Sequence, residues 1–195
     1  MPWSRRSSIR SASGSFPPIA DVLANRHSCR MVIRLEVPGD EEEISAVITE
    51  AFLRAEHSGG NEANIVKGLR EAGNLAVSLV AIEDERIVGH VAFSPITIDG
   101  RSCGWFGLAP VAVLPKRQRK GIGSALLETG LDMLRTHGAR GCVVLGEPTY
   151  YGRFGFAAHP ALRLEGVPPA YFQWQSFDDQ PFAGVVKYHP AFDSA

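Results

Sequence analysis

A basic, glycine-bearing loop between a hydrophobic strand and an amphipathic helix is the segment best suited to chemistry. It lies within Val111 to Leu127, with Gly121 and Gly123 at alternate positions and four basic residues just before them: Lys116, Arg117, Arg119 and Lys120. The first amide N–H groups of a helix have no partner inside the helix, and the helix dipole adds positive charge there. Glycine lets an anion approach these amides because no Cβ intervenes. The pattern therefore predicts a diphosphate site.

Two common phosphate motifs do not fit this loop. The P-loop pattern GxxxxGK[ST] is absent from the sequence. A dinucleotide motif needs a third glycine where Leu126 stands, and it follows the first strand of a βαβ unit. The alternative is that the glycines serve only a turn and that the basic residues are only solvated. Binding is favoured over this alternative because both features coincide at one helix start.

The residues before the loop predict a strand, two helices and a meander. Residues 31–35 (MVIRL) favour a strand. Asp40 followed by Glu43 resembles a capping box at the start of one helix, and Asn61 can cap a second helix that ends at Gly73. Apolar residues repeat at helical spacing in both segments.

Three further strands are expected to form an antiparallel meander, at residues 76–82, 87–98 and 105–113. The pair Asp99-Gly100 is a strong hairpin signal, and Pro95 indicates a bulge or an edge position.

After the loop, a helix ending at Gly138 precedes a short apolar strand at residues 142–145. A strand–helix–strand unit requires this strand to pair in parallel with residues 105–113. The remaining chain predicts a helical segment at 148–154, mostly loop at 160–180, and a last strand at 182–188. The fold class is therefore α/β (α+β), with a mixed central sheet and helices on both faces.

Two sequence motifs resemble those of the GNAT superfamily of N-acetyltransferases. The spacing Gln118-x-x-Gly121-x-Gly123 is similar to the family's acetyl-coenzyme A signature. The run YYGRFGF at residues 150–156 looks like its aromatic-Tyr-x-x-x-Gly-Phe signature. Together with GHVAFSP, LAPVAVLP and GIGSALL, the pattern is similar to the YhbS-like subgroup. The resemblance covers residues 31–195 and implies the GNAT fold, in which a parallel strand pair splays apart to admit the thioester.

The resemblance also implies acetyl-coenzyme A as the co-substrate. In such proteins the strand before the loop binds the pantetheine arm through its main chain, and the loop amides bind the pyrophosphate. The residues implied in coenzyme binding are Val111, Ala112, Val113, Gln118, Arg119, Lys120, Gly121, Ile122, Gly123 and Ser124.

Tyr151 aligns with the tyrosine that, in many family members, protonates the leaving thiolate. Attack by an amine gives a tetrahedral intermediate, and coenzyme A leaves more easily as a thiol, so a phenol near the sulfur has a clear use as a general acid. The structural alternative for Tyr151 is simple packing beside Phe154 and Phe156. The neighbouring Tyr150 is expected to point elsewhere.

The general base is less clearly indicated, because the strand at 105–113 carries no carboxylate. The candidates are Glu62 at a helix start, His90 in a meander strand and Glu147 after the apolar strand. A first-turn glutamate more often caps its helix, and a strand histidine is more often a core or surface residue. Deprotonation through water is an equal alternative.

The charge and composition of the sequence indicate how its domains are organised. The 195 residues carry a formal net charge of -1, of which residues 1–30 contribute +4 and residues 31–195 contribute -5. Residues 1–30 are rich in Arg and Ser, like a targeting peptide, and lack an apolar period. They are expected to be a disordered extension, with Met31 as a second start, while residues 31–195 form one domain.

Several partner classes are disfavoured. No run reaches the roughly 18 apolar residues of a membrane span. No histidine or cysteine spacing indicates a metal, and three cysteines without a CxxC pair favour a reducing cytoplasm. Nucleic-acid binding is disfavoured because residues 31–195 are acidic and no aromatic platform accompanies the basic loop.

The sequence thus predicts an N-acetyltransferase that moves an acetyl group to a primary amine by direct attack in a ternary complex. The alternative is a non-catalytic acyl-coenzyme A sensor that retains the loop. The acceptor is a small molecule or a peptide, and the sequence carries no code for it. A monomer and a homodimer are both compatible with the sequence.

Overall fold

The computed structural model describes residues 31–53, 59–178, 180 and 182–193, so the predictions for residues 1–30 lie outside it. The helices and strands, in chain order, are β1 (Val32–Leu35), α1 (Glu41–Phe52), α2 (Glu62–Glu71), β2 (Val77–Glu83), β3 (Arg86–Ile98), β4 (Arg101–Val113), α3 (Ile122–Thr136), β5 (Gly141–Leu145), α4 (Pro148–Tyr151), β6 (Leu162–Arg163), β7 (Phe172–Ser176) and β8 (Gly184–Lys187). Among the described residues there are also three 3-10 turns: η2 (Pro115–Arg117), η3 (Gly152–Phe154) and η4 (Pro190–Phe192).

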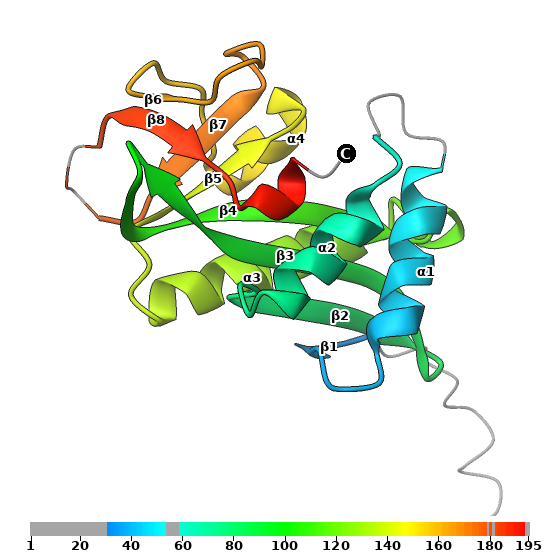
Figure 1. Ribbon diagram of the computed structural model, residues 1–195. Coiled ribbons are helices and arrows are strands. Elements are labelled where there is room, and N and C mark those ends of the chain that lie inside the picture. The colour runs from blue at the N-terminus through cyan, green and yellow to red at the C-terminus, as the bar shows by residue number, and fades with distance from the viewer. Residues whose placement is uncertain (1–30, 54–58, 179, 181, 194–195) are drawn as a thin grey trace, which may run out of the picture.

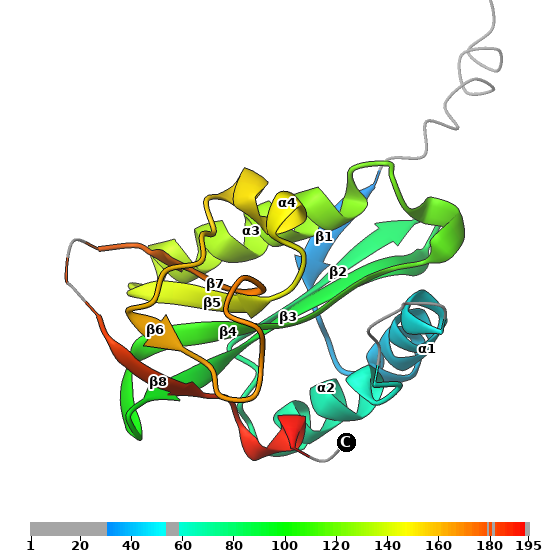
Figure 2. The ribbon, with the colours of Figure 1, turned by 90° about the horizontal axis from the view of Figure 1, so that it is seen from above.

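The central sheet is mixed and has helices on both faces, as the sequence predicts. Strands β1 to β4 form an antiparallel meander, β5 joins β4 in parallel, and β7 pairs antiparallel with β5. The short β8 pairs with the far end of β3 and with β6. Helices α1 and α2 cover one face, and α3 and α4 cover the other (Figures 1 and 2). The predicted α/β class, with a mixed central sheet and helices on both faces, is therefore confirmed.

The local turn signals are largely confirmed. Asp99 and Gly100 both have positive φ, of 49° and 74°, as the two central residues of a tight hairpin require. The β3–β4 register shifts at Pro95, where a bulge was expected. Helix α2 is followed by Gly73 in a left-handed conformation, with φ of 66°.

The expected helix caps are the exception. Neither Asp40 nor Asn61 makes a side-chain capping hydrogen bond. The Asp40 carboxylate instead accepts hydrogen bonds from the Arg34 guanidinium, at 2.6 and 3.0 Å, and from the Val37 amide. An ionic partner on β1 thus replaces the capping box because two charge-assisted hydrogen bonds outweigh one neutral cap.

The prediction of mostly loop at residues 160–180 is wrong for β7. Strand β7 pairs along its whole length with residues Gly141 to Leu145 of β5. Its sequence, FQWQS, carries three polar residues among five, so it lacks an apolar run. Gln173 is nevertheless buried, and its side chain donates to the Gly146 carbonyl. The strand is therefore stabilised by pairing that its own sequence does not reveal.

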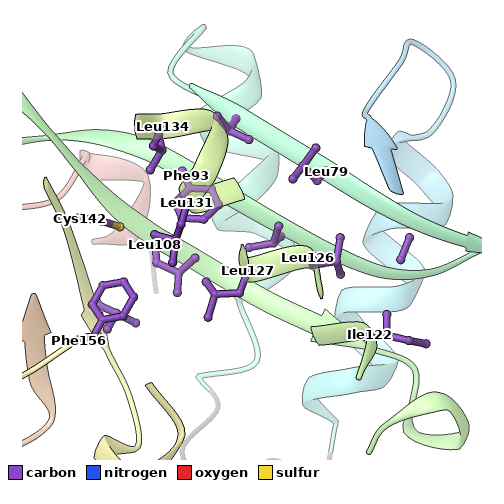
Figure 3. Packing of buried hydrophobic residues seen from close by; sticks show 14 of the residues in the cluster. Leu79, Phe93, Leu108, Ile122, Leu126, Leu127, Leu131, Leu134, Cys142 and Phe156 are labelled. Atoms are coloured by element: carbon purple, nitrogen blue, oxygen red, sulfur yellow. The ribbon is translucent and has the colours of Figure 1, made fainter. Parts of the chain in front are cut away.

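Helix α3 is held against the sheet by close packing at one glycine. Its apolar face, which includes Leu126, Leu127 and Leu131, joins the largest core cluster (Figure 3). A Cβ at Gly130 would lie 2.3 Å from the Phe93 ring, so only glycine lets the helix approach this closely. The packing fixes the height of α3 above the sheet and hence the place of its first turn.

We expect Gly130→Ala to destabilise the domain by about 1–3 kcal/mol, because overpacking against Phe93 outweighs the roughly 1 kcal/mol that alanine gains in a helix. Denaturant unfolding would measure the change. The control is Glu128→Ala, an exposed position on the same helix. A Gly130→Ala protein as stable as this control would contradict the packing argument.

Candidate active site

Strands β4 and β5 separate at the centre of the sheet. They pair only at Trp105–Gly141, Phe106–Cys142 and Gly107–Val143. Beyond Gly107, β4 continues to Val113 with partners in β3 alone among the described strands, and a register shift lies opposite Ala109 and Pro110. The backbone polar groups on that edge need partners from elsewhere. The splayed pair therefore leaves a gap with an unpaired strand edge.

A first cavity of about 770 Å³ lies at the head of α3, on the α3–α4 face. Gly121, with φ of 84°, is the N-cap of this helix, and no side chain caps it. The first-turn amides that follow have no acceptors within the helix. The lining residues are Val111, Val113, Arg117, Gln118, Arg119, Gly121, Ile122, Gly123, Ser124, Thr149, Tyr150, Tyr151 and Arg153.

Most of the residues predicted to bind the coenzyme line this cavity, and two do not. Ala112 is buried against the α1–α2 side of the sheet, and its main chain pairs with His90 of β3 rather than facing the gap. Lys120 is exposed outside the lining. At Gly123, a Cβ would lie 3.2 Å from the Tyr150 hydroxyl, so the glycine keeps the floor of the cavity open.

The basic loop is itself tied to the sheet. The Arg117 guanidinium pairs with Glu83 at 3.1 Å and lies 3.9 Å from Asp84, at the β2–β3 turn. The Gln118 side-chain amide donates to the Val113 carbonyl at 3.1 Å. These contacts hold the loop in place, so Arg117 contributes less positive charge to the cavity than the sequence suggests. Arg119 also lines the cavity and has a positive φ of 61°.

A second cavity, of about 700 Å³, lies on the α1–α2 side of the gap. Its lining comes from α1, α2, β4, β5 and the C-terminal segment, including β8. The turn η4 closes this side by packing against α2, as Figure 2 shows. The two cavities share Val111 and Tyr151 in their linings. A molecule in the first cavity can therefore meet one in the second through the β4–β5 gap.

Tyr151 stands at this junction. Its ring packs edge-on against Tyr150 and Phe156, at centroid distances of 5.0 and 6.1 Å. The ring also lies over Gly146, where a Cβ would come within 2.3 Å of it. Burial raises the pKa of the Tyr151 phenol well above its ordinary value. The phenol therefore keeps its proton at neutral pH and can donate it.

The three predicted base candidates lie in different places. Glu62 lines the second cavity and accepts a hydrogen bond from the Gly59 amide at 3.0 Å. Glu147 is exposed and caps α4 by accepting from the Thr149 amide at 3.4 Å. His90 lines neither cavity. Only Glu62 thus stands where an acceptor amine could approach.

His90 belongs to a buried polar network under α2. Its Nε2 lies 2.9 Å from the Ser78 hydroxyl, which also donates to Glu36. Arg70 of α2 donates to the other Glu36 oxygen. Burial lowers the pKa of His90 to about 4, and Arg70 adds to the effect although Glu36 opposes it. The imidazole is therefore neutral and structural at neutral pH.

Some cavity residues were not predicted as site residues. Thr149 and Arg153 line the first cavity, and so does Tyr150, although it was expected to point elsewhere. The Arg153 guanidinium lies 4.6 Å from the centre of the Tyr150 ring, and its Nε donates to the Tyr150 carbonyl. Tyr188 lines the second cavity. The aromatic motif at 150–156 signalled the first group, whereas no sequence pattern marked Tyr188.

Among the residues that the structure describes, no helix combines the length and apolar character needed to cross a bilayer. Within the same ranges, no three His, Cys, Asp or Glu side chains gather as metal ligands.

Comparison with known proteins agrees with this geometry. Residues 32–158 match the family model described as the acetyltransferase (GNAT) domain. The chain belongs to the GNAT acetyltransferase family. It is 39% identical over 170 residues to the uncharacterized N-acetyltransferase YhbS of Escherichia coli K12, covering 84% of this chain and 99% of the relative.

Two crystal structures of GNAT proteins are also similar. One is a GNAT family acetyltransferase from Brucella melitensis in complex with acetyl-coenzyme A. It has 47% identity and a TM-score of 0.76, over 85% of this chain and 99% of that one. The other is Escherichia coli YhbS in complex with coenzyme A. It has 36% identity and a TM-score of 0.79, over 85% and 93% of the two chains.

We expect His90 to make the domain less stable in acid. Its pKa is about 4 in the folded chain and 6.5 when unfolded, so the unfolded state takes up the proton first as the pH falls. Stability should drop by about 3 kcal/mol between roughly pH 6.5 and pH 4 from this group. Unfolding at several pH values, comparing His90→Gln with the exposed His137→Gln, would measure it. An unchanged slope in His90→Gln would contradict the assignment.

Proposed function

We propose that this GNAT protein binds acetyl-coenzyme A in the first cavity and transfers its acetyl group to a primary amine in the second. The observation that carries the proposal is the meeting of the two cavities at Val111 and Tyr151, through the gap between β4 and β5. Transfer would be direct, in a ternary complex, because each reactant has its own cavity and the thioester lies between them.

The residues present suit acetyl-coenzyme A. The first turn of α3, from Ile122 to Ser124, offers amides for the diphosphate, and Gly123 leaves room beside it. The open edge of β4 offers main-chain partners for the pantetheine amides at Val111 and at the Val113 amide, while the Val113 carbonyl already accepts from Gln118. The relatives from Brucella melitensis and Escherichia coli, crystallised with acetyl-coenzyme A and coenzyme A, support the same assignment here.

The chemical step needs two proton transfers. The amine nitrogen attacks the thioester carbonyl carbon, a C–N bond forms, and the C–S bond breaks as the tetrahedral intermediate collapses. The Tyr151 hydroxyl donates its proton to the departing sulfur. The buried, neutral phenol suits this role, since it holds its proton until thiolate charge develops beside it.

The proton lost by the amine is assigned to Glu62, directly or through a water molecule. Glu62 lies on the acceptor side of the gap, whereas Glu147 is engaged in capping and His90 is enclosed under α2. Its link to the Gly59 amide holds its carboxylate in place.

The non-catalytic sensor is less well supported. A sensor needs a coenzyme cavity but has no use for a second cavity on the acyl side of the gap, and this chain has both. We expect the enzyme to act in the cytoplasm as a monomer or homodimer, without a nucleic acid or membrane partner.

Tyr151→Phe is expected to lower kcat by about 10²–10⁴-fold, the usual contribution of a general acid, while the Kd for acetyl-coenzyme A stays within twofold. Thiol release would report kcat, and calorimetry would report Kd. Tyr171→Phe, at an exposed tyrosine outside both cavities, is the control. Equal turnover in the two variants would remove Tyr151 from the mechanism.

Gly123→Val is expected to weaken acetyl-coenzyme A binding at least tenfold, because its side chain would fill the floor of the cavity below Tyr150. Gly152→Val is the matched control, since a Cβ there meets nothing within 4 Å. Calorimetry on both variants tests the site. Unchanged affinity in Gly123→Val would place the diphosphate elsewhere.

A further inference from the structure

The second cavity is an apolar chamber with a few polar groups. All but six of its lining residues are apolar. The lining as a whole comes from α1, α2, β4, β5, β8 and the connecting segments. Phe52 and Phe192 supply aromatic surface near the α1–α2 side. Such walls favour an acceptor with a hydrocarbon or aromatic body, because burial of apolar surface is the main source of binding free energy there.

The charged groups of this cavity are mostly acidic. Glu62, Glu165 and Asp193 contribute three carboxylates, and Lys187 contributes one ammonium group. The three acids come from separate parts of the chain, and Glu165 and Asp193 are exposed. The fold therefore gathers negative charge around an apolar interior. This charge attracts a cation and repels an anion.

A buried hydroxyl lies where the chamber meets the sheet. The Tyr188 ring packs on Gly107, where a Cβ would lie 2.3 Å from it, and Gly107 is the last β4 residue paired with β5. The Tyr188 hydroxyl is buried and has no hydrogen-bond partner among the described residues. Burial raises the pKa of this phenol, so it stays neutral. An unpaired buried hydroxyl is costly, and a ligand N–H or oxygen would satisfy it.

We propose that the acceptor is a protonated primary amine on an uncharged apolar body, bound in this chamber with its ammonium end toward Glu62 and Tyr188. The inference rests on the proposed function, since it names the substrate class of the same site. Glu165 and Asp193 favour entry of the cation. The apolar walls hold its body, and Tyr188 positions the nitrogen beside the splayed strands.

Other amine classes fit less well. An amino acid would bring its carboxylate toward three carboxylates, with only the Lys187 ammonium among the lining residues to offset them. An amino sugar would bury several hydroxyls against apolar walls, each at a smaller cost than a buried charge. The chamber therefore selects against acceptors that carry anions or many hydroxyl groups.

Paired acceptors would test the class directly. Hexylamine and 6-aminohexanoate share a primary amine and a chain, and they differ in the terminal carboxylate. We expect kcat/KM for hexylamine to exceed that for 6-aminohexanoate at least tenfold, and 2-phenylethylamine to exceed glucosamine similarly. The full chain and acetyl-coenzyme A at a fixed saturating concentration are used, with thiol release and mass of the amide product as readouts.

Variants would test the roles of the side chains. The double variant E165Q/D193N should raise KM for hexylamine at least threefold and flatten its dependence on salt, whereas E128Q, on the other face of the sheet, should do neither. Tyr188→Phe should raise KM at least threefold and change kcat less, since a positioning residue acts on binding. Calorimetry with acetyl-coenzyme A would show that the coenzyme site is intact in each.

The outcomes distinguish a failure of this inference from a failure of the proposed function. If acetyl-coenzyme A binds but 6-aminohexanoate or glucosamine is acetylated as well as its partner, the acceptor class is overturned and the transferase assignment stands. The same holds if Tyr188→Phe and E165Q/D193N match E128Q. If the coenzyme binds but none of the four amines is acetylated, the acceptor class and the transferase function both fail, and the non-catalytic sensor is favoured. If acetyl-coenzyme A does not bind at all, the proposed function itself fails.

Discussion

The separation of β4 from β5 is the constraint on which the rest of the structure depends. Two parallel strands that pair for three residues and then part leave one edge of β4 without strand partners among the described residues. Backbone polar groups in such a place must bond to water or to a ligand. Pro110 and the nearby register shift bend β4 within this stretch, while Pro148 starts α4 soon after β5 ends. The sheet is thus built around an opening.

Helix α3 is useful only because it is held at one height above that opening. Packing of Phe93 under Gly130 fixes the helix against the meander, and the ion pair of Arg117 with Glu83 anchors the loop that leads into it. The result is a helix start aimed at a cavity that continues through the sheet. Burial then keeps the Tyr151 phenol neutral at the junction, where Tyr150 packs edge-on against its ring.

The sequence predicted the parts of the fold whose signals are local. The hairpin at Asp99, the helix end at Gly73 and the loop at Gly121 each depend on a few neighbouring residues, and the structure contains all three. β7 could not be predicted because its stability comes from pairing with β5, which lies far away in the chain. Capping by Asp40 failed for a different reason, since Arg34, only six residues away but on β1, binds its carboxylate.

The same contrast between local signals and contacts of distant segments applies to the candidate site. The first cavity comes from nearby segments that carry two spaced sequence motifs, so most of its lining could be predicted from the sequence. The second cavity joins α1 and α2 to the chain end, and nothing in the local sequence near Tyr188 shows that it will lie over Gly107. His90 was named as a base candidate in a strand, with a core or surface role as the alternative, and the network of Ser78 and Glu36 encloses it.

This division has an evolutionary consequence. The first cavity is lined by residues within 111–153, one stretch of chain, whereas much of the second cavity comes from residues 164–193, which lie beyond the region matched by the family model. Mutations in residues 164–193 can therefore alter the second cavity without replacing any residue that lines the first. Proteins descended from one ancestral gene could thus differ in the second cavity while they retain the same residues around the first.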